Sequence, residues 1–346
     1  MKAYQIGDQA GLQSLTAVER PDLVAGPGMA VVRVRSVCLN HRDIKILSGR
    51  YGVRRAPERV PVSEGVGEVV ALGAGAAGIS IGDRVICAHF FTWLGGPFTP
   101  AVFASDLGVT HDGWLAEQLL VPAAALVPVP AGLDDAQAAP LAAAGLTAWN
   151  ALVEFGTLKA GNWVLALGTG GVSMFALQIA KMHGARVIIT SSSDEKLALA
   201  RKLGADATIN YRTEPEWAAA VVKATGGGAN LVVETGGQAT LSQSIAAAAP
   251  NGRIAIIGAL ADQATEGLPN FGTLIGKNLT LKGIAAGSRA MLADFVAAAD
   301  ANDLKPVVDS TFPFDRAADA YAYLESGKQV GKVMLIVRGT HADLRS

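Results

Sequence analysis

Residues 161–173 read GNWVLALGTGGVS, and this stretch decides the fold of the chain. An apolar run, Trp163–Leu167, leads directly into a glycine-rich turn, and a helical pattern from Val172 to Met182 follows at once. A strand, turn and helix of this kind bring bare glycine backbone and the first helical amides toward a bound phosphate group. The stretch therefore predicts a cradle for the pyrophosphate of a dinucleotide.

The turn departs from the usual glycine pattern at one position, because Ser173 stands where the third glycine is expected. Its context supports the same interpretation, since a further strand, Arg186–Thr190, follows at the spacing of a βαβ unit. An ordinary strand-to-helix turn without a ligand is the alternative. The motif predicts cofactor contacts from Gly168, Thr169, Gly170, Gly171, Val172 and Ser173.

The composition is that of a globular protein with a large core. The chain has 346 residues, of which 50% are hydrophobic and 17% charged, and this length suggests two domains. Its formal net charge is -1, so nothing in it attracts nucleic acid or an anionic membrane in general. We expect a small-molecule substrate.

The two cysteines, Cys38 and Cys87, exclude a disulfide framework and favour a reducing compartment. The N-terminus reads as a short strand and lacks the apolar core of a signal peptide, and no uninterrupted apolar stretch is long enough to span a membrane. We therefore expect a cytoplasmic protein.

The rhythm of the sequence changes along the chain. Residues 1–129 carry mainly strand signals and predict an antiparallel β domain, whereas residues 130–286 alternate between helix and strand, as in a parallel sheet covered on both faces. Residues 287–346 are expected to return to the first domain. The strands of the doubly wound domain are predicted at Trp163–Leu167, Arg186–Thr190, Ala207–Ile209, Leu231–Glu234, Arg253–Ile257 and Leu279–Ile284.

The end of the second of these strands distinguishes NADH from NADPH. An acidic side chain there binds the ribose hydroxyls of NADH and repels the extra phosphate of NADPH. The chain instead has hydroxyls and nearby cations, which favour NADPH/NADP. The residues of this predicted phosphate pocket are Ser191, Ser192, Ser193, Lys196, Tyr211 and Arg212.

Two alternatives bear on that pocket. Asp194 would take the ribose role if it lay at the strand end, but residues 192–195 resemble a helix start in which Glu195 completes a capping box. Lys196 would then be a solvated residue of that helix.

The chain resembles the medium-chain dehydrogenase/reductase superfamily, and within it the zinc-free branch of quinone oxidoreductase-like proteins. The resemblance covers nearly the whole length and implies a GroES-like catalytic domain beside a Rossmann domain. Besides the cofactor turn, the segments that carry it are Asn40-His41-Arg42-Asp43, Glu64-Gly65-Val66-Gly67-Glu68-Val69, Gly82-Asp83-Arg84-Val85, Gly113-Trp114-Leu115-Ala116-Glu117, Gly145-Leu146-Thr147-Ala148 and Gly331-Lys332-Val333.

The resemblance also shows what is missing. At the positions of the three catalytic zinc ligands in zinc-dependent members, this chain has Asn40, Ser63 and Ala143, and the four-cysteine lobe for structural zinc is absent. We therefore expect no metal. One alternative remains open, because Cys38, His41, Cys87 and His89 are potential ligands at tolerable spacing.

Without zinc, the negative charge that hydride transfer leaves on the substrate needs another form of stabilisation. A quinone or an enone spreads this charge, so that a few hydrogen-bond donors suffice. By the resemblance, Asn40 faces the nicotinamide and is the first candidate to bind the substrate oxygen, unless it only caps the following helix. Arg42 is a candidate to hold an oxyanion, and the candidate proton donors are His41, Lys45 and Tyr51.

The resemblance places further residues along the cofactor. Thr147 and the backbone near Gly258, Ala259 and Ile284 are expected beside the nicotinamide, and Lys332 near the phosphates. It also implies a homodimer, formed through the edge strand Leu279–Ile284.

Three functions remain open on this basis. The leading one is an NADPH-dependent oxidoreductase that reduces quinones or α,β-unsaturated carbonyl compounds. The second is a zinc-free NADP(H)-dependent alcohol dehydrogenase or carbonyl reductase. The third is a non-catalytic NADPH-binding protein that acts as a sensor or binds RNA, and the near-neutral net charge counts against RNA.

Overall fold

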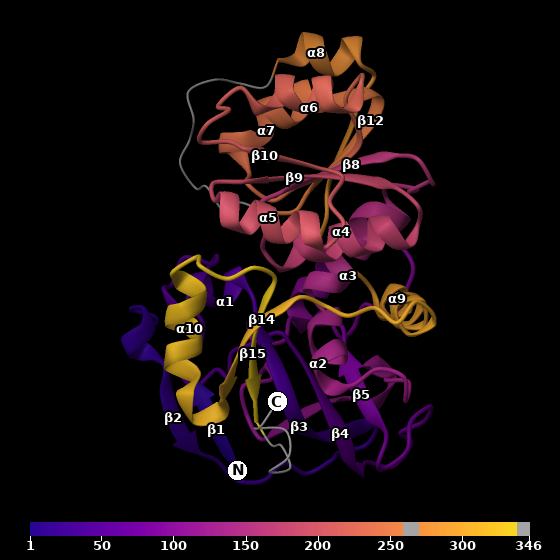
Figure 1. Ribbon diagram of the computed structural model, residues 1–346. Helices are drawn as coiled ribbons and strands as arrows, with labels where there is room; N and C mark the ends of the chain where they lie inside the picture. The colour runs from indigo at the N-terminus through magenta and orange to yellow at the C-terminus, as the bar shows by residue number, and fades with distance from the viewer. Residues whose placement is uncertain (259–269, 338–346) are drawn as a thin grey trace. The chain divides into compact units, whose positions relative to one another are not determined.

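The computed structural model describes residues 1–258 and 270–337, which form two compact units (Figure 1). Unit 1 comprises Met1–Leu146 together with the segment from Gly287 onward, and unit 2 comprises Thr147–Ala286. By their contacts, residues 130–146 group with unit 1. The reason is that the short helices of residues 135–141 pack against strands of unit 1.

Unit 1 is built on a seven-stranded, mainly antiparallel sheet. Its strands follow the order β14-β15-β3-β4-β5-β7, β6 pairs with β3, and only β14 and β15 run parallel to each other. The strands are β3 (Met29–Leu39), β4 (Glu64–Leu72), β5 (Arg84–Cys87), β6 (Gln118–Pro122), β7 (Leu126–Pro128), β14 (Val308–Pro313) and β15 (Lys332–Ile336). A separate antiparallel pair consists of β1 (Lys2–Gln5) and β2 (Thr16–Glu19).

The helices of unit 1 are short, apart from two near its C-terminal end. The α-helices are α1 (His41–Leu47), α2 (Asp135–Ala138), α9 (Arg289–Ala301) and α10 (Ala317–Glu325). The 3-10 helices are η1 (Leu12–Ser14), η2 (Pro100–Ser105), η3 (Ala123–Ala125), η4 (Ala139–Leu141) and η6 (Phe314–Arg316). Helix α3 (Ala144–Trp149) and the π-helix η5 (Asn150–Glu154) follow η4 along the chain.

Two glycines of β4 allow close packing at the centre of unit 1. A Cβ atom at Gly65 would lie 2.8 Å from the ring of Trp114, which is fully buried, and a Cβ atom at Gly67 would lie 2.4 Å from the carbonyl oxygen of Arg33. Strand β4 therefore lies close against β3 and the Trp114 ring, and this fixes the position of Glu64 at its start.

Unit 2 is a doubly wound domain with a six-stranded parallel sheet in the order β10-β9-β8-β11-β12-β13. The strands are β8 (Trp163–Leu167), β9 (Arg186–Ser191), β10 (Ala207–Asn210), β11 (Ala229–Glu234), β12 (Ala248–Ile256) and β13 (Thr280–Gly283). The helices are α4 (Gly171–Met182), α5 (Asp194–Lys202), α6 (Trp217–Thr225), α7 (Gln238–Ala247) and α8 (Phe271–Gly276). Helices α4 and α5 cover one face of this sheet, and α6 and α7 the other (Figure 1).

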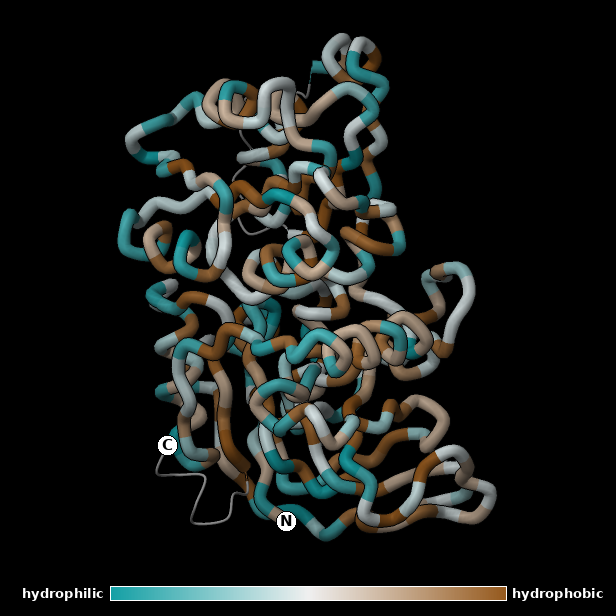
Figure 2. Tube along the Cα trace, turned by 45° about the vertical axis from the view of Figure 1, so that its right-hand side comes forward, coloured by the Kyte–Doolittle hydropathy of each residue, from teal (hydrophilic) through white to brown (hydrophobic). Residues whose placement is uncertain are grey.

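Each unit has its own hydrophobic core. In unit 2 the strands β8, β9 and β11 are almost entirely buried, as their apolar runs predict, whereas the edge strand β13 is largely exposed. Figure 2 shows hydrophobic residues along the central strands of each unit. Within the described residues, no helix combines the length and the apolar character that crossing a membrane requires.

Candidate active site

The predicted cofactor turn lies between β8 and α4 in unit 2. Gly168 adopts a left-handed conformation with φ of 74°, and a Cβ atom at Gly168 or Gly170 would meet no atom within 4 Å. Gly170 is the N-cap of α4, and no side chain caps the first amides of the helix. The turn thus leaves open space in front of a helix N-terminus, which fits a pyrophosphate.

Ser173 explains why the third glycine is not needed. Its side chain is buried and its hydroxyl donates to the carbonyl oxygen of Leu167 at 2.6 Å, so it fastens α4 to the end of β8. The hydroxyl therefore serves the fold, and of the predicted contacts of Ser173 only a backbone contact remains. Of its neighbours in the turn, Thr169 is buried, Val172 is half-buried and Gly171 is the first residue of α4.

The predicted phosphate pocket gathers at the ends of β9 and β10, which are neighbouring strands. Ser191 is buried at the end of β9, and its carbonyl oxygen accepts the backbone N–H of Tyr211 at 3.1 Å. The Tyr211 side chain is exposed, and Ser192 and Lys196 are half-buried. The structure therefore brings these four residues to the same edge of the unit 2 sheet.

The start of helix α5, which follows β9, differs from the capping box that the sequence predicts. Ser193 is the N-cap of α5 and its hydroxyl accepts the N–H of Lys196 at 3.4 Å, so that Glu195 does not stand at the capping-box position. Asp194 is in the first turn, where its carboxylate accepts a hydrogen bond of 2.8 Å from the side chain of Asn210. Asp194 thus has a partner within the protein.

The remaining predicted cofactor residues of unit 2 are placed as follows. Gly258 donates its N–H to the carbonyl oxygen of Glu234 at 3.3 Å, and a Cβ atom there would lie 2.1 Å from the carbonyl oxygen of Thr235. Ile284 is buried and donates its N–H to the carbonyl oxygen of Ile256 at 2.8 Å, while Thr147 is buried at the start of the unit. Ala259 lies outside the described residues.

The central feature of unit 1 is a buried ion pair between Lys332 and Glu64. The ammonium of Lys332, at the start of β15, is 2.6 Å from Oε1 of Glu64, and the side chains are 3% and 0% exposed. The ammonium also donates to Oδ1 of Asn40 and to the carbonyl oxygen of Leu39, each at 2.7 Å. We call the three side chains of Lys332, Glu64 and Asn40 the ammonium–carboxylate–amide network.

All three N–H donors of the Lys332 ammonium are used within this network and its surroundings. A lysine ammonium has three N–H donors, and here each has an oxygen acceptor within unit 1. The side chain therefore has an internal role in unit 1, and its predicted contact with the cofactor phosphates stays a prediction.

Glu64 is fully paired as well. Its Oε1 accepts from Lys332 and from Nδ2 of Asn40, the latter at 2.8 Å, and its Oε2 accepts the backbone N–H groups of Ala143 at 2.7 Å and Ala144 at 3.2 Å. Because four donors converge on this buried carboxylate, the Glu64 side chain is held in one position.

Asn40 joins the network to helix α1. Its backbone N–H donates to Oδ2 of Asp43 at 2.7 Å, and α1 begins at the next residue. Unlike Glu64 and Lys332, the Asn40 residue is only half-buried. It is therefore the member of the network that a ligand can reach.

Arg42 forms a second buried ion pair, with Asp106. Its guanidinium donates to the Asp106 carboxylate at 2.6 Å and to the carbonyl oxygen of Leu107 at 3.0 Å, and it lies 5.6 Å from the centre of the Tyr51 ring. Burial opposes the charge, but the carboxylate of Asp106 outweighs it and raises the pKa of Arg42. Arg42 is thus a permanent cation, already neutralised by a partner that the sequence did not reveal.

The predicted proton donors, together with the nearby His89, differ in their surroundings. His41 is exposed at the start of α1, and Lys45 and Tyr51 are half-buried. His89, in contrast, is buried, its Nδ1 has no hydrogen-bond partner, and burial together with the charge of Arg42 lowers its pKa. His89 is therefore a neutral imidazole.

Asp43 and Tyr321 are buried, and the charge of Asp43 acts on the Tyr321 hydroxyl. Burial raises the pKa of Asp43 to about 6, and its Oδ1 has no hydrogen-bond partner. The Tyr321 hydroxyl is also buried without a partner, and burial and the nearby Asp43 charge raise its pKa.

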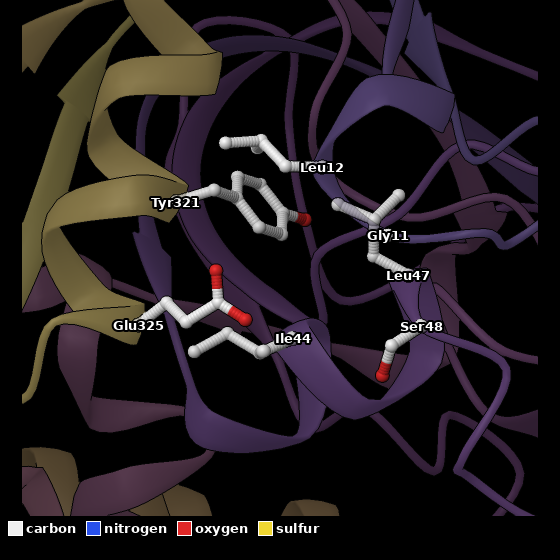
Figure 3. Close-up of a pocket in the computed structure, with 7 residues that line it drawn as sticks. All are labelled: Gly11, Leu12, Ile44, Leu47, Ser48, Tyr321 and Glu325. Carbon is white, nitrogen blue, oxygen red and sulfur yellow. The ribbon is translucent and has the colours of Figure 1, made fainter.

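A cavity of about 20 Å³ borders Tyr321, enough for one water molecule (Figure 3). Figure 3 shows the Tyr321 ring among the aliphatic side chains of Leu12, Ile44 and Leu47. At this volume the cavity is too small for a quinone or an enone, so it is not a substrate site.

The residues at the family's zinc positions do not fit a zinc ion. Asn40, Ser63 and Ala143 provide neither a thiolate nor an imidazole, and the cationic ammonium of Lys332 lies against Asn40 and Glu64. In residues 1–258 and 270–337, no three His, Cys, Asp or Glu residues gather in a group able to hold a metal ion. Cys38, Cys87 and His89 are buried while His41 is exposed, so they form no such group.

Comparison with known proteins agrees with the two-unit architecture. Residues 26–131 match the family description "Alcohol dehydrogenase GroES-like domain", and residues 171–301 match "Zinc-binding dehydrogenase". A zinc-type alcohol dehydrogenase-like protein of Schizosaccharomyces pombe is 45% identical over 89% of this chain and 91% of its own length.

Two solved structures of other proteins are similar to nearly the whole chain. The crystal structure of an NAD-dependent alcohol dehydrogenase has a TM-score of 0.88 at 33% identity and covers 98% of this chain and 100% of its own. A mycobacterial protein in complex with NADPH has a TM-score of 0.80 at 28% identity and covers 97% of this chain and 100% of its own.

A GroES-like β unit joined to a doubly wound unit with a dinucleotide turn defines an oxidoreductase that uses a nicotinamide cofactor. The chain belongs to the medium-chain dehydrogenase/reductase superfamily, among its zinc-type alcohol dehydrogenase-like members.

Proposed function

We propose that this protein is an NADPH-dependent oxidoreductase that reduces quinones or α,β-unsaturated carbonyl compounds by hydride transfer without zinc. The observation that carries the proposal is the ammonium–carboxylate–amide network, which lies where the family's metal ligands are expected. When bound, the nicotinamide supplies a hydride, that is, one hydrogen with two electrons.

The donors present favour a conjugated acceptor. An isolated ketone or aldehyde places the whole negative charge on one oxygen, whereas a quinone or an enone spreads it over a hydroquinone anion or an enolate. The half-buried amide of Asn40 offers a neutral hydrogen bond, and Arg42 is occupied by Asp106. Because neutral donors stabilise charge less than a metal ion, the acceptor has to delocalise part of it.

The preference for NADPH rests on the end of β9. Ser191 and Ser192 stand where an acidic residue would bind the ribose of NADH, and Asp194 is bonded to Asn210. Lys196, on the first turn of α5, is the nearby cation for the additional phosphate of NADPH.

A second candidate is a zinc-free alcohol dehydrogenase or carbonyl reductase acting on isolated aldehydes and ketones. The names of the relatives favour it, since they include alcohol dehydrogenases. The network counts against it, because it contains no residue fitted to hold a Lewis acid.

A panel of acceptors tests these candidates. Loss of the absorbance of reduced nicotinamide is followed with quinones, enones and simple aldehydes, each with and without a chelator. The proposal predicts turnover of the conjugated acceptors and no effect of the chelator. Turnover of aldehydes alone would establish the second candidate, chelator inhibition would refute a zinc-free reaction, and tight NADPH binding without turnover would indicate a non-catalytic binding protein.

The cofactor preference is tested separately. Lys196→Ala is expected to raise the Kd for NADPH by about tenfold, the effect of losing about 1.4 kcal/mol of charge-assisted binding, and to leave the Kd for NADH nearly unchanged. Lys202→Ala, in the last turn of the same helix, is the matched control. Equal effects of Lys196→Ala on the two cofactors would contradict the phosphate pocket.

A further inference from the structure

The network fixes the orientation of the Asn40 amide. An ammonium only donates and a carboxylate only accepts, so Oδ1 of Asn40 has to face Lys332 and Nδ2 has to face Glu64. Turning the amide over would bring NH₂ against the ammonium and the carbonyl oxygen against the carboxylate. Both charge-assisted hydrogen bonds would be lost, and the buried charges prevent water from replacing them.

One N–H of this amide stays available after these bonds are made. Nδ2 carries two hydrogens, and Glu64 accepts one of them. Asn40 is half-buried, whereas Glu64 and Lys332 are 0% and 3% exposed. An oxygen atom of a ligand therefore meets the amide and neither of the two charged groups.

Lys332 also changes the strength of that donor. Its ammonium withdraws electron density from Oδ1, and a carbonyl polarised in this way makes the N–H groups of the same amide better donors, since linked hydrogen bonds reinforce one another in a low-dielectric site. Asn40 alone would be an ordinary amide with a rotating side chain. Held by Lys332, it is a preorganised donor.

We infer that Lys332 is a positioning residue which orients and polarises the Asn40 amide, so that this amide donates a hydrogen bond to the acceptor oxygen as it becomes negative. This inference rests on the proposed function. In the reaction, the hydride forms a bond to the electrophilic carbon of the acceptor, a π electron pair moves to the oxygen as the enolate or hydroquinone anion, and a proton from solvent completes the product.

A double-mutant cycle tests whether Lys332 acts through Asn40. Asn40→Ala is expected to lower kcat by about 10²-fold, the usual loss when one donor to a developing oxyanion is removed. Lys332→Met is expected to lower kcat by a similar factor, and the double variant to be no slower than either single variant. Lys332→Arg, which keeps a cation, is expected to recover part of the rate. If the loss of kcat in the double variant equals the product of the losses in the two single variants, the inference is overturned.

A second pair of variants distinguishes a loss of kcat from a failure to fold. Lys332→Met leaves the buried Glu64 carboxylate without its counter-ion, whereas Lys332→Met combined with Glu64→Gln removes both charges. The combined variant is expected to fold, to bind NADPH as the wild type does, and to show the kcat loss of Lys332→Met. A wild-type kcat in a combined variant that folds would contradict the role of Lys332. Lys328→Met, at an exposed lysine of unit 1, is the matched control.

A spectroscopic measurement separates this inference from the proposed function. With 15N-labelled asparagine, the Asn40 side chain is expected to give two well-separated amide proton signals, assigned by their loss in Asn40→Ala. In Lys332→Met these signals are expected to move toward the chemical shifts of exposed asparagine amides, because the amide is free to leave its hydrogen bond to Glu64. Unchanged signals would overturn the positioning role even if turnover falls. If the wild type reduces no acceptor, the proposed function fails while this measurement still decides the role of Lys332.

Discussion

Replacing Asp43 with asparagine is expected to stabilise the protein at neutral and alkaline pH, and the gain should grow as the pH rises. The Asp43 side chain is buried, Oδ2 accepts the N–H of Asn40, and Oδ1 has no partner. An asparagine keeps the first contact through its carbonyl oxygen. It also replaces the oxygen that has no partner among the described residues with an uncharged NH₂ group.

The direction in which stability changes with pH follows from the direction of the pKa shift of Asp43. Burial raises the pKa of Asp43 from 3.8 to about 6, and Glu64 adds to the rise, while Arg42 and Lys332 lower it. The folded state therefore holds the proton more tightly than the unfolded state. The stability that this proton provides is complete below pH 3.8 and is lost as the pH rises through about 6.

The magnitude follows from the same shift. A rise of about two pKa units corresponds to about 3 kcal/mol, of which about 2 kcal/mol falls between pH 4 and pH 8. The difference in the free energy of unfolding between Asp43→Asn and the wild type should therefore grow by about 2 kcal/mol over this range.

Urea unfolding of both proteins at a series of pH values measures this difference. Asp303→Asn, at an exposed carboxylate of unit 1, controls for the loss of a negative charge as such. Parallel pH profiles of Asp43→Asn and the wild type would refute the reasoning, because they would mean that Asp43 has the same proton affinity in the folded and unfolded states.

Three further substitutions test the packing and the cofactor turn. Gly67→Ala places a Cβ atom 2.4 Å from the Arg33 carbonyl oxygen and is expected to cost about 3 kcal/mol in urea unfolding; a loss below about 1 kcal/mol would contradict the close approach. Gly168→Val forces a β-branched residue to a φ of 74° and is expected to raise the Kd for NADPH about tenfold in a fluorescence titration, so unchanged binding would count against the cradle. Ser173→Ala loses the bond to Leu167 and is expected to cost about 1 kcal/mol, whereas a neutral effect would show that the hydroxyl does not fasten α4.

The sequence predicts the fold because the signals for it are local. The strands β8, β9 and β11 of the doubly wound unit are short, mainly apolar runs, and the predicted bounds of Trp163–Leu167 are those of β8. The cofactor turn is likewise contained within a few consecutive residues. The grouping of residues 130–146 with unit 1 has no such local signal, because α2 and η4 belong to it through packing against distant strands.

The ammonium–carboxylate–amide network could not be predicted in the same way. Lys332 lies 292 positions from Asn40 and 268 from Glu64 along the chain, and only the antiparallel pairing of β15 with β3 and of β3 with β4 brings them together. One local signal existed, because a lysine that begins an otherwise apolar strand requires a buried partner if that strand is central. The Arg42–Asp106 pair had no comparable signal.

Stability alone does not account for such a network. Moving a lysine and a glutamate out of water costs several kcal/mol for each ion, and replacing a buried ion pair by apolar residues of similar size is often neutral or stabilising. Here the ion pair of Lys332 and Glu64 is almost completely buried. Asn40, the one uncharged member of the network, is only half-buried. An apolar replacement would fill the same space but would leave the amide free to turn. The cost of burying Lys332 and Glu64 is therefore better explained by the orientation that they impose on Asn40 than by any gain in folding.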